Sequence, residues 1–165
     1  MTRDRDPAGR PRNARPRDAL GRPLDPADGP GSGADRIPDD LVITGAEAAA
    51  LADRLLRDGR PFHAHEVLEA AWKNGPDDER MLWQGLAQLA VGITHAQRGN
   101  VNGATSLLRS ASARLSHDDR RGRYAIDVAG LVDFAGALID DLAAGVQITP
   151  QRLRPRLVVV KSSRR

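Results

Sequence analysis

Two segments of the chain place charged or amide side chains among apolar ones, and they hold its best candidates for chemistry. The segments span residues 61–72 and 83–95. Burying polar groups without partners costs several kcal/mol, roughly 2–7 for an amide or hydroxyl, so such groups need a reason. They either close a hydrogen-bonded core or line a site. The polar residues in question are His65, Glu66, Glu69, Gln84, Gln88 and His95, with Trp72 beside them.

Helical spacing decides which of these residues can meet. On one helix, His65, Glu69 and Trp72 stand at i, i+4 and i+7, which is a single stripe. On the next helix Gln84, Gln88 and His95 form an equivalent stripe. Helices joined by a short turn usually pack as antiparallel neighbours. We therefore expect the two stripes to face each other and to bring together His65, Glu69, Gln88 and His95.

Such a cluster permits two kinds of chemistry. In the first, His65 and Glu69 pair within the core, and the amides bridge the helices or line a small ligand pocket. In the second, His65, Glu69 and His95 hold a divalent metal, because zinc, manganese and iron accept imidazole and carboxylate ligands. Glu66 would then complete a site for metal-assisted hydrolysis. Against the second hypothesis, the His-Glu-x-x-His pattern is missing. After His65 and Glu66, the position of the second histidine is occupied by Glu69.

The overall composition indicates one folded domain. The chain has 165 residues, 40% of them hydrophobic, and no cysteine, which excludes disulfides and thiolate metal sites. Its start mixes both charge signs, and no apolar run reaches the roughly 18 residues of a membrane helix. We expect a cytoplasmic protein with no membrane segment.

Charge is distributed unevenly. Residues 1–40 carry 8 Arg and 8 Asp, residues 41–146 carry 11 basic and 14 acidic groups, and residues 147–165 carry 6 basic and no acidic groups. The net charge of +3 therefore comes from a short tail. With a slightly acidic core and few aromatics, nucleic-acid binding is not expected beyond weak contact through this tail.

The three regions differ in composition as well. Residues 1–40 contain seven prolines and five glycines and almost no large apolar residues, which predicts a disordered head. Residues 41–146 have helical spacing throughout, and residues 147–165 form the basic tail.

Start and stop signals divide the middle region into about five helices. Thr44 and Glu47 form a capping box for a first helix of about 13 residues. Pro61 begins a second helix, on which His63 is expected at the solvated edge. The fold class is therefore all-α, a compact bundle. The other three helices are expected from Asp77 to about Arg98, over 104–115, and from Asp127 to Gly145.

The motifs on the second and third helices resemble the family of domains of unknown function numbered 309, over residues 43–143. The resemblance implies a small all-helical bundle, and it implies no reaction. Its signature positions would be His65, Glu66, Glu69, Trp72, Gln84, Gly85, Gln88 and His95. The motifs that carry it are Phe62-His63-Ala64-His65-Glu66-Val67-Leu68-Glu69 with Trp72, Gln84-Gly85-Leu86-Ala87-Gln88-Leu89-Ala90, and His95-Ala96-Gln97-Arg98-Gly99-Asn100 with Gly103-Ala104.

Three functions stay open from the residues alone. The first is a structural or ligand-binding bundle, with a homodimer or another partner as its assembly. The second is the metal-dependent hydrolase described above. The third is an interaction scaffold, because the hairpin over residues 81–115 resembles one tetratricopeptide-like unit. No period of about 34 residues recurs, however, and such solenoids need at least three stacked repeats.

Overall fold

The computed structural model describes residues 41–117 and 123–159, and within them it confirms the all-α bundle. The head over residues 1–40, for which the sequence predicts disorder, lies outside the described residues. Among the described residues no helix combines the length and the apolar character needed to cross a membrane. The five α-helices are α1 (Gly45–Arg57), α2 (Pro61–Asn74), α3 (Arg80–Gln97), α4 (Val101–Ser116) and α5 (Val128–Ala143). Short 3-10 helices are η2 (Asp77–Glu79), η3 (Arg123–Ala125) and η4 (Pro150–Leu153).

Local side-chain caps explain where three of the helices begin. The first N–H groups of a helix have no partner inside it, so a cap that accepts from them stabilises the start. Each of these caps accepts from the backbone N–H three residues on: Thr44 from Glu47 at 3.2 Å, Asn100 from Gly103 at 3.1 Å and Asp127 from Gly130 at 3.1 Å. Proline at the first position begins α2.

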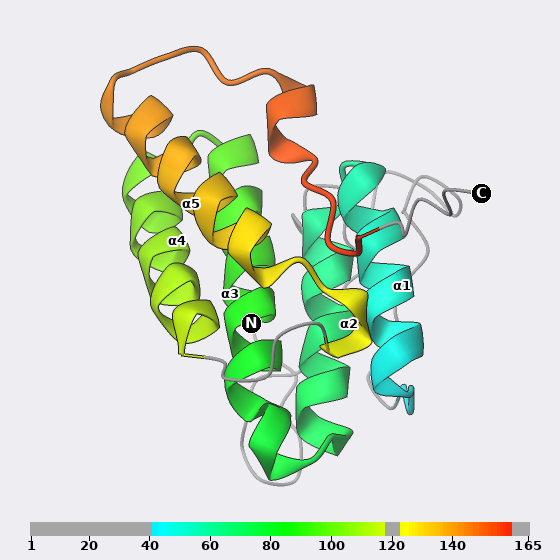
Figure 1. Ribbon diagram of the computed structural model, residues 1–165. Helices are drawn as coiled ribbons and strands as arrows, with labels where there is room; N and C mark the ends of the chain where they lie inside the picture. The colour runs from blue at the N-terminus through cyan, green and yellow to red at the C-terminus, as the bar shows by residue number, and fades with distance from the viewer. Residues whose placement is uncertain (1–40, 118–122, 160–165) are drawn as a thin grey trace, which may run out of the picture.

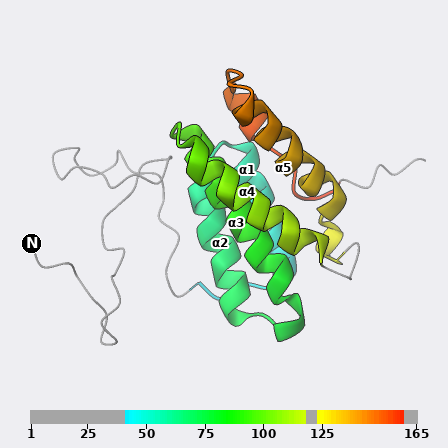
Figure 2. The same cartoon turned by 90° about the vertical axis from the view of Figure 1, so that its left-hand side faces the viewer.

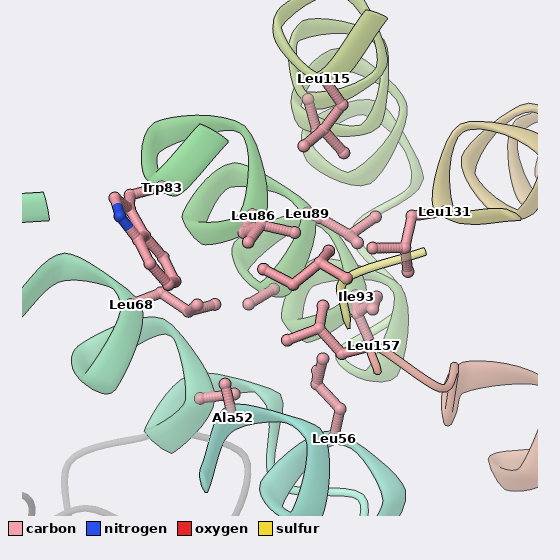
Figure 3. Close-up of a cluster of buried hydrophobic side chains, with 14 of the residues drawn as sticks. Ala52, Leu56, Leu68, Trp83, Leu86, Leu89, Ile93, Leu115, Leu131 and Leu157 are labelled. Atoms are coloured by element: carbon pink, nitrogen blue, oxygen red, sulfur yellow. The ribbon is translucent and has the colours of Figure 1, made fainter. Parts of the chain in front are cut away.

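Helices adjacent in sequence are adjacent in space. Contacts join α1 to α2, α2 to α3, α3 to α4 and α4 to α5, and α5 lies at the edge of the bundle next to α4 (Figure 1, Figure 2). The core is built around α3, as Figure 3 shows for Trp83, Leu86, Leu89 and Ile93. Around them pack Ala52 and Leu56 of α1, Leu68 of α2, Leu115 of α4 and Leu131 of α5.

Two glycines let α3 and α4 approach closely. A Cβ atom on Gly85 would lie 3.0 Å from the Leu115 side chain, and one on Gly92 would lie 3.0 Å from Leu108. Both leucines are fully buried. The Gln-Gly-Leu segment is thus explained by packing, because a larger residue at Gly85 would push the two helices apart.

The chain after α5 returns across the bundle as a C-terminal strap, residues 147–159 (Figure 1, orange to red). The sequence assigns this stretch to a basic tail, but Leu153 and Leu157 are part of the core, at 4% and 0% exposure. The strap forms an antiparallel bridge between Val158 and Ile126. The packed domain therefore extends past residue 146, because apolar residues that alternate with arginines are buried against it.

Asp53 of α1 holds the strap in place. Its Oδ1 accepts hydrogen bonds from the backbone N–H of Leu157 at 2.8 Å and of Val158 at 3.1 Å. Its Oδ2 lies 2.9 Å from Nε of Arg57. A buried carboxylate is tolerated when several donors satisfy it, and here three donors converge on one side chain.

We predict that Asp53→Ala lowers the free energy of unfolding by about 3 kcal/mol, because two buried amides and Arg57 lose their acceptor. Urea denaturation measures this loss. Asp133→Ala is the matched control, since Asp133 is exposed on α5, and its effect should stay within roughly 0.5 kcal/mol. Equal losses in the two variants would contradict the role given to Asp53.

Candidate functional site

The outer side of α2 carries a half-buried stripe between buried residues. Phe62, His65, Glu66, Glu69 and Trp72 are each partly covered, whereas Ala64, Val67 and Leu68 are buried completely. This pattern arises because α2 packs between α1 and α3, which leaves only a narrow strip near solvent. The predicted stripe of His65, Glu69 and Trp72 therefore exists.

His65 and Glu69 lie together on this stripe. His65 Nε2 is 3.7 Å from Glu69 Oε2, which is too long for a hydrogen bond. Lys73 Nζ is closer to the same carboxylate, at 3.2 Å from Oε1. Burial lowers the pKa of His65 from its ordinary value because it disfavours the imidazolium, while Glu69 opposes this shift and Lys73 adds to it. His65 is therefore neutral at neutral pH.

Gln84 faces α4. Arg114 Nη1 of α4 donates to Gln84 Oε1 at 2.7 Å. The same nitrogen lies 3.8 Å from the Met81 sulfur. Gln84 thus ties α3 to α4, which sequence spacing on its own helix did not indicate.

His95 closes the turn between α3 and α4. Asn100 Nδ2 is 3.0 Å from His95 Nδ1, and Asn100 Oδ1 caps Gly103 N. The amide NH₂ of asparagine can only donate, so His95 Nδ1 is assigned the acceptor role. His95 therefore has a structural contact at one end of α3.

The described residues do not assemble the metal ligands predicted from the sequence. They contain no group of three or more His, Cys, Asp or Glu side chains placed to hold a metal ion. His65 lies near Glu69, whereas His95 contacts the α3–α4 turn. Of the residues expected to converge, His65, Glu69, Gln88 and His95, the last is bound to Asn100 at the C-terminal end of α3.

His63 is also placed differently from the prediction. It was expected at a solvated helix edge, but it is only 2% exposed. The Phe62 ring packs edge-on to it, with centroids 6.1 Å apart, and also contacts the His65 ring at 5.9 Å. The physical reason is that α2 packs against α1 on one side and α3 on the other, so the position of His63 is enclosed.

Two polar atoms, one on α2 and one on α3, are sealed without a hydrogen bond. Gln88 Oε1 and His65 Nδ1 are inaccessible to water and have no hydrogen-bond partner among the described residues. They do not share a surface, because Gln88 stands one turn after Gln84, which binds Arg114 of α4, so its side chain lies on the α4 side of α3. Each such atom costs roughly 1–3 kcal/mol. We call Phe62, His65, Glu69 and Trp72 the α2 seam.

A second polar cluster was missed by the sequence analysis. Glu79 is 8% exposed and accepts from Trp83 Nε1 at 3.0 Å and from the Tyr124 hydroxyl at 2.5 Å. Arg123 Nη1 lies 3.4 Å from the same carboxylate. The sequence analysis places Glu79 only within the expected third helix, which begins at Asp77. The i, i+4 spacing of Glu79 and Trp83 was the available signal.

The backbone at Tyr124 supports this cluster at some cost. Tyr124 and Ala125 have φ of 54° and 56°, which residues other than glycine seldom adopt. The Tyr124 ring packs on Trp83, with centroids 5.5 Å apart, and lies against Gly45, where a Cβ atom would clash with it. The hydrogen bond to Glu79 is the main reason why the pKa of Tyr124 is raised.

We predict that the pKa of Tyr124 responds to Glu79. The phenolate absorbance of this single tyrosine should titrate above pH 10, and Glu79→Gln should lower the midpoint. Because the folded-state pKa is the higher one, this contribution to stability is present below about pH 10 and is lost as pH rises past it. An unchanged midpoint in folded Glu79→Gln would contradict the hydrogen bond.

The titration of His65 gives a separate prediction. Followed by NMR, its ring should titrate below 6.5, Glu69→Gln should lower the midpoint further, and Lys73→Gln should raise it. Since the folded-state pKa is the lower one, the associated stability is present above about pH 6.5 and is lost as pH falls below it. A parent midpoint at or above 6.5 would show that burial is not the main cause, and shifts in the reverse directions would contradict the roles given to Glu69 and Lys73.

The polar residues of the seam lie within the part of the chain that resembles known proteins. Uncharacterized protein YpuF of Bacillus subtilis (strain 168) is 38% identical over 60 residues, which cover 36% of this chain and 34% of that protein. The chain thus spans about a third of the length of this relative. No solved structure gives a significant match. Residues 50–107 match the family model "Domain of unknown function (DUF309)", which confirms over α1 to α4 the resemblance inferred from the sequence.

Proposed function

We propose that this protein is a non-catalytic binding module that recognises a segment of a partner protein through the α2 seam. The proposal rests on one observation, the sealed atom His65 Nδ1. A protein that folds with this atom unpartnered gives up stability. A partner that displaces the side chain covering it and supplies a hydrogen bond would recover that stability on binding.

The chemistry around this atom fits a polypeptide. Phe62 and Trp72 are half-buried at the two ends of the α2 stripe, about 15 Å apart along the helix axis. Aromatic side chains often supply most of the binding energy at protein interfaces. Neutral His65 can donate or accept a hydrogen bond. A backbone or amide group of a partner meets this requirement.

The arrangement of the helices also favours a binding role. Consecutive antiparallel helices stacked in chain order are typical of helical repeat proteins, which use extended surfaces for binding. Five helices are fewer than three such repeats, so the module would act as a compact bundle. We propose a cytoplasmic location, with which the lack of cysteine is compatible.

His65→Leu separates a binding role from a structural one. We predict that this variant is more stable than the parent, by up to about 2 kcal/mol in urea, because a sealed polar atom is replaced by an apolar group. We also predict that it loses the partner. The readout is photo-crosslinking in the native cells from a probe at Lys73, which is exposed one turn from Glu69.

Two controls accompany this experiment. A probe at Arg109, exposed on α4, should not give the crosslinked product. Sedimentation of the purified protein distinguishes a second copy of the chain from a different partner. If His65→Leu is stabilised and still gives the same crosslink, the seam is not the binding surface. If it is destabilised, His65 has a structural partner and the carrying observation fails.

A further inference from the structure

The C-terminal strap presents arginines in a fixed alternating pattern. Leu153, Pro155 and Leu157 are buried, whereas Arg154 and Arg156 between them are exposed. Successive side chains of an extended segment point to opposite sides. The two arginine side chains therefore leave the strap on the side opposite its buried residues, from positions about 7 Å apart along it.

Contacts on several sides hold the strap where it is. Asp53 accepts from the N–H of Leu157 and Val158, and Val159 N donates to Ala125 O at 2.8 Å. The Arg154 guanidinium lies over the turn between α1 and α2, with Nε 3.0 Å from the point where a Cβ on Gly59 would be. This arginine is therefore positioned beside the end of α1.

The end of α1 adds further positive charge. Arg54 and Arg57 follow at i and i+3 on α1, both exposed to solvent. Asp53, the nearest acid, is buried and already bound to the strap and to Arg57. Asp58 is the one exposed acid among the described residues of this turn. We call Arg54, Arg57, Arg154 and Arg156 the arginine face.

The sequence continues the same sign of charge beyond this face. After Val159 come six residues that include Lys161, Arg164 and Arg165 and no acid. The whole stretch from residue 147 to the last residue contains no Asp or Glu. Positive charge is thus concentrated in residues 147–165 of the sequence, although the protein as a whole carries a net charge of only +3.

We propose that the arginine face binds the phosphate backbone of duplex nucleic acid without reading its sequence. Arginine forms bidentate hydrogen bonds with phosphate, and a duplex carries about one charge per 1.7 Å of its axis. The fold fixes the positions from which these arginines extend, which suits a regular array of anions. The weak tail contact expected from the sequence becomes a preorganised one, because the strap is ordered before binding.

An acidic protein partner fits this face less well. Protein interfaces are usually anchored by buried aromatic or large apolar side chains. On the strap the exposed large apolar residue is Val159. The Phe134 ring of α5 is covered by Arg152, whose guanidinium carbon lies 5.2 Å from the ring centroid. A surface that offers charge alone matches a partner that is bound by charge alone.

The test is fluorescence anisotropy of a labelled random-sequence DNA duplex titrated with the full chain. Four phosphate contacts give a slope of log affinity against log salt of about −3.6. Arg154→Ala/Arg156→Ala should weaken binding roughly tenfold at low salt and reduce the slope by about 1.8. Both residues are exposed, so circular dichroism should confirm an unchanged fold.

The matched control is Arg80→Ala/Arg109→Ala, which removes the same charge from exposed positions on α3 and α4. It should leave affinity and slope near those of the parent. Equal weakening by both pairs would mean that only net charge matters, and it would overturn the proposal. So would no effect of the strap pair, or binding of polyglutamate or anionic vesicles in preference to the duplex.

Discussion

The enclosure of α3 is the constraint on which the rest of the structure depends. No residue from Leu82 to Gln97 is fully exposed, although several of them are polar. Each polar side chain on this helix is therefore at least partly removed from water. Gln84 accepts from Arg114 of α4, His95 contacts Asn100 of the turn, and Gln97 donates to Gly59 O beside α1 at 3.2 Å. Gln88 Oε1 and Gln97 Oε1 have no hydrogen bond among the described residues.

Two buried carboxylates join segments that follow α4 to the rest of the bundle. Asp53 holds the strap, and Glu79 collects Trp83, Tyr124 and Arg123. A carboxylate removed from water needs several donors, so each one becomes a junction between distant segments. Both acids lie within residues 50–107, which match the family model, whereas Tyr124 and the strap lie after them. The later segments are thus joined to the matched region by hydrogen bonds as well as by apolar packing.

The two proposed surfaces differ in their physical chemistry. The seam combines aromatic rings with a sealed imidazole nitrogen, a setting in which direction and desolvation decide specificity. The arginine face is exposed and offers charge, a setting in which affinity depends strongly on salt and little on the detailed shape of the partner. The seam is built from α2, whereas the arginine face is built from α1 and the strap. The two bindings can therefore be tested by separate substitutions.

Local signals in the sequence determined the helices, and only the tertiary structure decided where their polar side chains point. Thr44, Pro61 and Asp127 act within one turn of their own position, so their roles could be predicted from spacing. The i, i+4 spacing that brings His65 near Glu69 is equally local. By contrast, Tyr124 reaches Glu79 across 45 residues, and Leu157 reaches Asp53 across 104. Helical periodicity shows which residues share a face but not which neighbour covers that face. For this reason His63, His95 and the strap were placed correctly only once the packing of all five helices was known.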